Sequence, residues 1–112
     1  MKIRWKDHVR FAPDKMARVS LSSTDRTQLD LYCVAPGQSQ KAHTHEAQDK
    51  IYYVLEGTGR FTLAGREMTL EAGETLVVAA GVEHGLLNDG PHPLLVLVVV
   101  APPPPHGPGA SR

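Results

Sequence analysis

Residues 37–88 are GQSQKAHTHEAQDKIYYVLEGTGRFTLAGREMTLEAGETLVVAAGVEHGLLN, and most predictions for this chain depend on them. The stretch contains the pair His43 and His45 near its start and His84 near its end. Side chains alternate along an extended strand, so His43 and His45 are expected to project from the same face. His84 can join them only if the chain folds back. The pattern predicts a three-imidazole metal site, and imidazole suits zinc, copper, iron and nickel.

Short segments of β character separate the two histidine clusters. Glycines fall at positions 57, 65, 73 and 81, an even spacing of eight residues, and residues 60–63, 67–70 and 75–78 between them are predicted strands. Residues 51–55 also have strong β propensity. Turns at this interval indicate an antiparallel meander that closes into a barrel or sandwich, because closure removes exposed edges. We therefore predict an all-β fold.

The flanking segments complete a single predicted domain. Residues 1–12 are interpreted as an N-terminal arm with short strands at 3–5 and 8–12, which must pair with the barrel edge or with a second subunit. The barrel is predicted to span residues 13–101, with further strands at 17–21 and 27–34, the latter with one face drier than the other. Cys33 is interpreted as a small buried apolar residue. The proline-rich tail, residues 102–112, is predicted to be extended or disordered.

Residues 94–100 are apolar on both faces of a predicted strand. One face would point into the barrel. The other needs a cover, which either the N-terminal arm or a partner subunit could provide, because apolar strips of that size are uncommon on the surface of monomers. We predict a homodimer.

Composition excludes several classes of function. The 112 residues contain twelve basic and twelve acidic side chains, so the formal charge is zero, and the basic residues are scattered. No overall field would attract nucleic acid or an anionic membrane, and neither is predicted as a partner. The N-terminus is charged and lacks a secretory signal, and the longest apolar run has eight residues, too short for a membrane helix. We predict a cytoplasmic protein.

The glycine and histidine spacings resemble those of the cupin superfamily, specifically the small single-domain cupins. Its first motif is matched in register by Gly37, His43, His45 and Gly57, and its second motif by a further four residues: Gly73, Gly81, His84 and Asn88. Ala79 stands where the family usually has proline, and the spacer between the motifs has the short length typical of small microbial cupins. The resemblance implies a cupin-type, jelly-roll-like antiparallel β-barrel. It also implies a metal near the barrel centre, bound by the three histidines and a fourth residue.

The fourth ligand position departs from the family pattern. The family has a glutamate six residues before the glycine that matches Gly57, and this chain has Lys50 there. A protonated lysine has no lone pair to donate. Gln48 shares the parity of Lys50 and offers an amide oxygen, whereas Asp49 would need a bulge to turn it inward. Water is the third alternative. Without a carboxylate, the charge of the metal would favour anionic substrates.

Two further residues are candidates for contact with a substrate. Lys50 either points inward near the metal or lies at the barrel mouth with its amine in water. Of the adjacent tyrosines, one should line the barrel and the other its exterior. The family register makes Tyr52 the residue that faces the pocket, where it would serve either a substrate or the core.

The function suggested by these residues is a metal-dependent enzyme, of dioxygenase or isomerase type, that acts on a small oxygenated molecule. Its cofactor would be a divalent transition metal, namely iron, manganese, nickel, zinc or copper. The alternative is a non-catalytic cupin module that binds a metal or a small ligand, because one fold can serve both uses.

Overall fold

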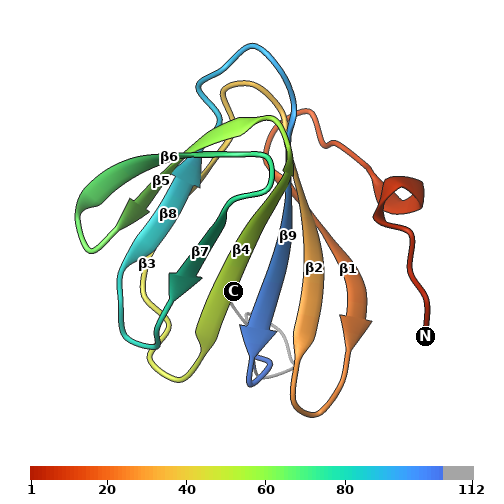
Figure 1. Cartoon of the computed structure of the whole chain (residues 1–112), viewed down its shortest axis with the longest axis vertical. Coiled ribbons are helices and arrows are strands. Elements are labelled where there is room, and N and C mark those ends of the chain that lie inside the picture. The colour runs from red at the N-terminus through yellow and green to blue at the C-terminus, as the bar shows by residue number, and fades with distance from the viewer. Residues whose placement is uncertain (105–112) are drawn as a thin grey trace.

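The computed structural model describes residues 1–104, in which nine strands form two facing antiparallel sheets (Figure 1). The strands are β1 (Ala17–Ser23), β2 (Gln28–Val34), β3 (Ser39–His43), β4 (Asp49–Glu56), β5 (Thr58–Leu63), β6 (Arg66–Glu71), β7 (Thr75–Val78), β8 (His84–Leu87) and β9 (Leu94–Ala101). One sheet has the order β1-β2-β9-β4-β7, and the other has the order β3-β8-β5-β6. The predicted all-β, antiparallel fold is confirmed.

The order of the strands corrects the predicted meander. Only the pairs β1–β2 and β5–β6 join consecutive strands within one sheet, while β4 pairs with β7 and β9, and β8 pairs with β3 and β5. Evenly spaced glycines mark turns but do not determine which strands become neighbours. Because successive strands cross between the two sheets, the chain encloses an interior instead of forming a flat ribbon.

The alternation of strand β4 shows how the interior is filled. Lys50, Tyr52 and Val54 are buried, whereas Ile51 and Tyr53 are exposed on the outer face. The prediction that the two tyrosines lie on opposite faces, with Tyr52 inward, is therefore confirmed. Strand β9 contributes the central apolar row of the same sheet, and most of its residues are buried. These inward rows form the main core and leave room for a few polar side chains.

Strand β2 is buried on both faces, whereas the sequence predicted one face drier than the other. Its inward residue Tyr32 joins the main core, and its outward residues Leu31 and Cys33 form a second core with Ala17 and Leu95. The N-terminal arm covers this second core with half-buried apolar residues, namely Trp5, Val9 and Ala12. Cys33 is buried as predicted, and burial raises the pKa of its thiol.

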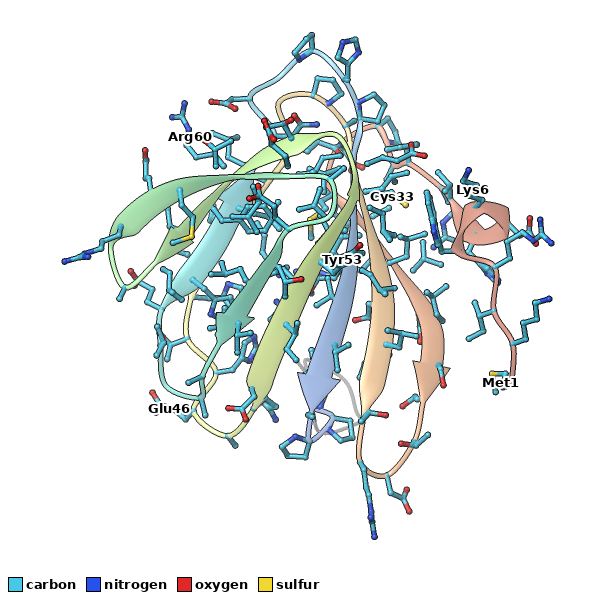
Figure 2. The ribbon with its side chains drawn as sticks, in the orientation of Figure 1. Met1, Lys6, Cys33, Glu46, Tyr53 and Arg60 are labelled. Carbon is cyan, nitrogen blue, oxygen red and sulfur yellow. The ribbon has the colours of Figure 1, made fainter. Side chains whose placement is uncertain are left out.

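The arm itself contains no strand. The predicted strands at residues 3–5 and 8–12 are wrong, since Trp5–His8 form a 3-10 helix (η1) and the neighbouring residues are irregular. The arm is held by side-chain contacts and not by a strand ladder. The amide nitrogen of Arg10 donates to Sγ of Cys33 at 3.5 Å, and Nε2 of Gln38 donates to the carbonyl of Ala12 at 2.7 Å. Figure 2 shows Lys6 on η1 and Cys33 on β2, with the arm outside the sheet.

The outer face of β9 is covered only in part. Leu95 lies beneath the arm, whereas Leu97 and Val99 remain half-buried. Within residues 1–104, no helix is long and apolar enough to cross a membrane. The predicted tail begins at Pro102, and its residues 105–112 lie outside the part of the chain that the structure describes.

Candidate metal centre

Three histidines converge at one end of the barrel. His43 ends β3 and His84 begins β8, and the two residues are directly paired across the strands. His45 lies in the loop after β3, where its carbonyl accepts a hydrogen bond from the amide of Gly81 at 2.8 Å. One ligand nitrogen from each of the three rings lies within 4.8 Å of the others. In Figure 2 the label of Glu46, the residue after His45, marks this end of the barrel, and the label of Arg60 marks the opposite end.

A bulge in β3 sets the position of His43. Gln40 pairs with Leu86 and His43 pairs with His84, so β3 has one extra residue between these pairs. The bulged strand approaches β8 closely at Gly85. A Cβ on Gly85 would lie 2.9 Å from both the amide nitrogen of Ala42 and the carbonyl oxygen of Gln40. Glycine at this position therefore allows the two histidine-bearing strands to approach closely.

Backbone carbonyls orient two of the imidazoles. Nδ1 of His43 lies 2.7 Å from the carbonyl of Lys41, and Nδ1 of His84 lies 2.9 Å from the carbonyl of Val82. A carbonyl can only accept, so each Nδ1 carries the proton and each Nε2 keeps its lone pair. The Nε2 atoms of all three histidines are buried, and those of His43 and His84 have no hydrogen-bond partner among residues 1–104. This tautomer and orientation are the ones that a metal ligand requires.

Burial keeps these imidazoles neutral. Loss of hydration, together with the charge of Lys50, lowers the pKa of His84 from its ordinary value to about 4, against the opposing effect of the Val82 carbonyl. The pKa of His43 is also lowered, first by burial and then by the charges of Lys50, His45 and Arg18. A neutral imidazole can donate its lone pair, so the site is ready for a cation at neutral pH.

The fourth position of the cluster is occupied by no carboxylate of residues 1–104. The group of potential ligands contains the three histidines and no cysteine, aspartate or glutamate. Asp49 lies on the outward face of β4 and is exposed, and its Oδ1 accepts a hydrogen bond from the amide of Ala80 at 2.9 Å. Gln48 is half-buried just before β4. The structure thus turns Asp49 away from the histidines, and the choice between Gln48 and water stays a prediction.

Lys50 points into the barrel. Only 1% of the Lys50 surface is exposed. The alternative in which its amine lies in water at the barrel mouth is therefore wrong. Its Nζ lies 5.2 Å from the ring centre of Tyr32 and 5.0 Å from that of Tyr52, and it donates to Oε1 of Gln40 at 3.4 Å. Two aromatic faces and an amide oxygen stabilise the ammonium that strand alternation forces inward.

Gln40 connects the polar side chains of the interior. Its Oε1 accepts from the hydroxyl of Tyr52 at 2.8 Å, and its Nε2 donates to the hydroxyl of Tyr32 at 3.4 Å. Burial raises the pKa of Tyr52 above its ordinary value, so the phenol stays protonated and acts as a donor. The ring of Tyr52 lies 6.1 Å from that of His84. Together these contacts make a polar wall beside the histidines.

Sequence reasoning missed Gln40 and Tyr32 as members of this wall. Tyr32 lies on the same face of β2 as Asp30 and Val34, and the sequence alone did not assign that face to the interior. Gln40 precedes His43 in β3, but the extra residue between them means that their spacing in the sequence does not indicate whether they share a face. His8, His92 and Glu83 lie outside the cluster, and all three are exposed.

Comparisons with known proteins found relatives of this chain in sequence and in fold. TcmJ, a tetracenomycin polyketide synthase protein of Streptomyces glaucescens, is 36% identical over 69 residues, which cover 62% of this chain and 46% of that protein. An oxalate-binding protein of Thermotoga maritima is 35% identical over 65 residues, which cover 58% of this chain and 54% of that protein. The chain therefore spans about half the length of these relatives.

A solved structure is similar over nearly the whole barrel. TT1209 from Thermus thermophilus matches with a TM-score of 0.87 and 41% identity, covering 91% of this chain and 98% of that one. The family model described as a cupin domain matches residues 30–100, which is more than half of the 112 residues. That range includes both histidine-bearing strands and the loop that carries His45. By its sequence and its fold, this chain belongs to the cupin family.

Proposed function

We propose that this protein is a metal-dependent enzyme of dioxygenase or isomerase type that acts on a small, oxygenated and anionic molecule. The observation that carries the proposal is the arrangement of His43, His45 and His84, whose ligand atoms lie within 4.8 Å of one another. The buried Nε2 atoms of His43 and His84 lack any partner in the described chain, which is costly unless a cation satisfies them. The residues present therefore fit a divalent transition metal.

The chemistry available at the site follows from its donor set. When bound, iron, manganese, nickel, zinc or copper would polarise a substrate carbonyl or support reaction with dioxygen. The three imidazoles are neutral ligands, and Lys50 stands where the family pattern has a glutamate. No carboxylate of the described cluster offsets the charge of the metal, so the site favours a substrate that brings negative charge.

The interior wall supplies groups that hold a substrate. Tyr52 is protonated and donates to Gln40, and Lys50 lies between two aromatic rings with its ammonium near the same amide. Both are candidates for contact with substrate oxygens. Because these groups are buried and packed, they orient a ligand with little further loss of side-chain freedom.

The second candidate function is a cupin module that binds a metal or a small ligand without catalysis. The missing carboxylate favours it, because a catalytic site often needs a general base beside the metal. The similarity to a relative named as an oxalate-binding protein also favours it. The two functions differ in turnover, since a binding module would hold its ligand unchanged.

The test of metal binding is elemental analysis of protein purified without chelator, with the variant His84→Ala beside the wild type. We expect about one metal ion per chain in the wild type and almost none in the variant, because two remaining imidazoles bind a cation much more weakly. His92→Ala is the matched control, since His92 is exposed and lies outside the cluster. A full metal content in His84→Ala would contradict the proposal, and absence of turnover in a metal-loaded wild type would favour the binding module.

A further inference from the structure

A basic pocket lies where the N-terminal arm meets β1. Its volume is about 400 Å³, within the range of small-molecule sites, and six residues line it: Arg10, Ala12, Lys15, Met16, Ala17 and Arg18. Three of the six side chains are cationic and none is acidic. Asp30, a buried carboxylate of β2, is not among the lining residues, and neither is the exposed Asp14.

The three cations of this pocket are not held in salt bridges within the described chain. Among residues 1–104, neither Arg10 nor Lys15 nor Arg18 forms a salt bridge, although the chain as a whole has as many acidic as basic side chains. Like charges gathered around one concave surface repel one another unless an anion lies between them. Two guanidinium groups also provide the planar, forked donors that match a carboxylate.

The pocket adjoins the interior that contains the metal centre. Arg18 pairs directly with Tyr32 across β1 and β2, and its guanidinium carbon lies 6.0 Å from the centre of that ring. Tyr32 then contacts Gln40, which accepts a hydrogen bond from Tyr52 beside His84. Ala12, which also lines the pocket, is tied to Gln38 immediately before β3. One wall of packed side chains therefore joins the pocket to the histidine-bearing strand.

We propose that the pocket of Arg10, Lys15 and Arg18 binds the distal carboxylate of a dicarboxylic acid whose other end reaches the histidine cluster. The proposal rests on the proposed function for the end of the ligand that binds at the histidine cluster. The pocket itself is a separate site with its own residues. It narrows the substrate class to acids with two carboxylates held apart by a carbon chain. A molecule with two adjacent carboxylates would bind only at the histidine cluster and would not reach the basic pocket.

The test measures binding of four acids of increasing length, namely oxalate, malonate, succinate and glutarate, to the full chain with and without zinc. Calorimetry gives the affinities of the zinc-loaded protein, and amide NMR shifts report weak binding to the metal-free protein. The variants are Arg18→Gln and Arg10→Gln. Arg66→Gln is the matched control, because it removes the same charge from an exposed position at the start of β6 in the other sheet.

We expect Arg18→Gln to weaken binding of the best longer acid about tenfold or more, because a charged hydrogen-bonding partner is lost. Oxalate affinity and zinc content should change much less, and Arg66→Gln should bind every acid as the wild type does. Arg18→Lys, which keeps the charge, should retain part of the affinity. Equal affinity of the longer acids for the wild type, Arg18→Gln and Arg10→Gln would overturn the proposal.

The metal-free titration separates the two proposals. If the wild type binds neither zinc nor any of the other proposed metals, the proposed function fails, and binding of glutarate to the metal-free protein then tests the pocket by itself. Shifts at residues 10–18 that Arg18→Gln abolishes would support the pocket. If those residues do not respond to glutarate in wild-type protein, with or without zinc, the pocket proposal is wrong.

Discussion

Lys50 places a positive charge where the family pattern has a metal ligand. Its side chain is buried, it contacts Tyr32, Tyr52 and Gln40, and its charge is one cause of the lowered pKa values of His43 and His84. The same charge repels a metal ion. One residue therefore reduces the affinity of the site for a cation and increases its preference for an anionic ligand.

Replacing Lys50 tests this effect at a single position. We expect Lys50→Glu to raise zinc affinity about tenfold or more, because it removes a like charge and adds an oxygen ligand. The metal-free variant should be less stable than the wild type, since its buried carboxylate lacks a cation. Calorimetric zinc titration measures the affinity, and thermal unfolding with and without zinc measures the stabilisation.

Lys41→Glu provides the control for long-range charge. Lys41 is exposed, and only its backbone carbonyl contacts His43, so the same change of charge occurs close by without placing a carboxylate in the interior. We expect a small gain in zinc affinity. An equal gain in both variants would show that charge alone, and not ligation from position 50, explains the result.

The stability of metal-free protein should depend on the protonation of His84. In the fold its pKa is about 4, whereas in the unfolded chain it is near the ordinary value of about 6.5. Between these values the unfolded state binds more protons, so the free energy of unfolding falls as the pH decreases from about 6.5 toward 4. Denaturant titrations at several pH values measure it.

His84→Gln removes the titrating group and should flatten part of this dependence, while His92→Gln should leave it unchanged. A wild-type stability that is constant between pH 7 and pH 5 would contradict the prediction. For metal binding the same lowered pKa has a second consequence. Proton competition should begin at a lower pH than the value near 6.5 expected for a free imidazole.

At the level of elements, the pairing of β3 with β8 determines the metal centre. The extra residue in β3 brings the backbone of Ala42 close to Gly85. The next residue of β3, His43, then pairs with His84. His45 lies beyond the end of β3, so the two nearby histidines are not successive inward residues of one regular strand, as simple alternation had predicted. A bulge followed by a loop brings both imidazoles into the same cluster.

Gly85→Ala should disturb this pairing. The new Cβ would lie 2.9 Å from backbone atoms of β3, which cannot move aside as a flexible side chain can. We expect a loss of about 1–3 kcal/mol in the free energy of unfolding, as for other overpacked sites, together with weaker zinc binding. Denaturant unfolding and zinc titration measure the two effects.

Gly90→Ala is the matched control for this strand contact. A Cβ on Gly90 would lie 3.6 Å from Oδ1 of Asn88, an ordinary contact. We expect little change in stability or zinc affinity. If Gly85→Ala behaves like Gly90→Ala, the close approach of β3 and β8 is not what positions His43.

At the level of the whole molecule, the outer face of the larger sheet carries an apolar strip that the arm does not cover. Ile51 and Val77 are paired across β4 and β7, and Tyr53 follows on the same face of β4. Their exposed fractions are 37%, 62% and 39%. This strip continues toward the half-buried Leu97 and Val99 of β9, so we propose that a second copy of the chain covers it.

The homodimer is tested by Val77→Glu. A charge within this apolar contact should convert the dimer to monomer, because the carboxylate would lose its hydration on association. Sedimentation velocity measures the mass. Thr69→Glu, at an exposed position on the other sheet, should remain dimeric. A monomeric wild type at all concentrations tested would contradict the proposal.

The sequence alone determined the strand-rich character, the inward position of Tyr52 and the three histidines of the cluster. These properties follow from local rules, namely β propensity, the alternation of side chains and the spacing of histidines and glycines. Such rules operate over a few residues and need no knowledge of which strands are neighbours. The predictions that rest on these rules therefore hold, although the structure corrects the predicted meander and the predicted strands of the N-terminal arm.

Only the tertiary structure decided the order of the strands, the burial of Lys50 and the orientation of Asp49. Each depends on contacts between residues far apart in the chain, such as Lys50 with Gln40 or Asp49 with Ala80. The arm shows the same limit, because its apolar residues fit a strand pattern but are satisfied by packing over Cys33 and Leu95. Local alternation places a side chain on one of two faces, and the rest of the fold determines what covers each face.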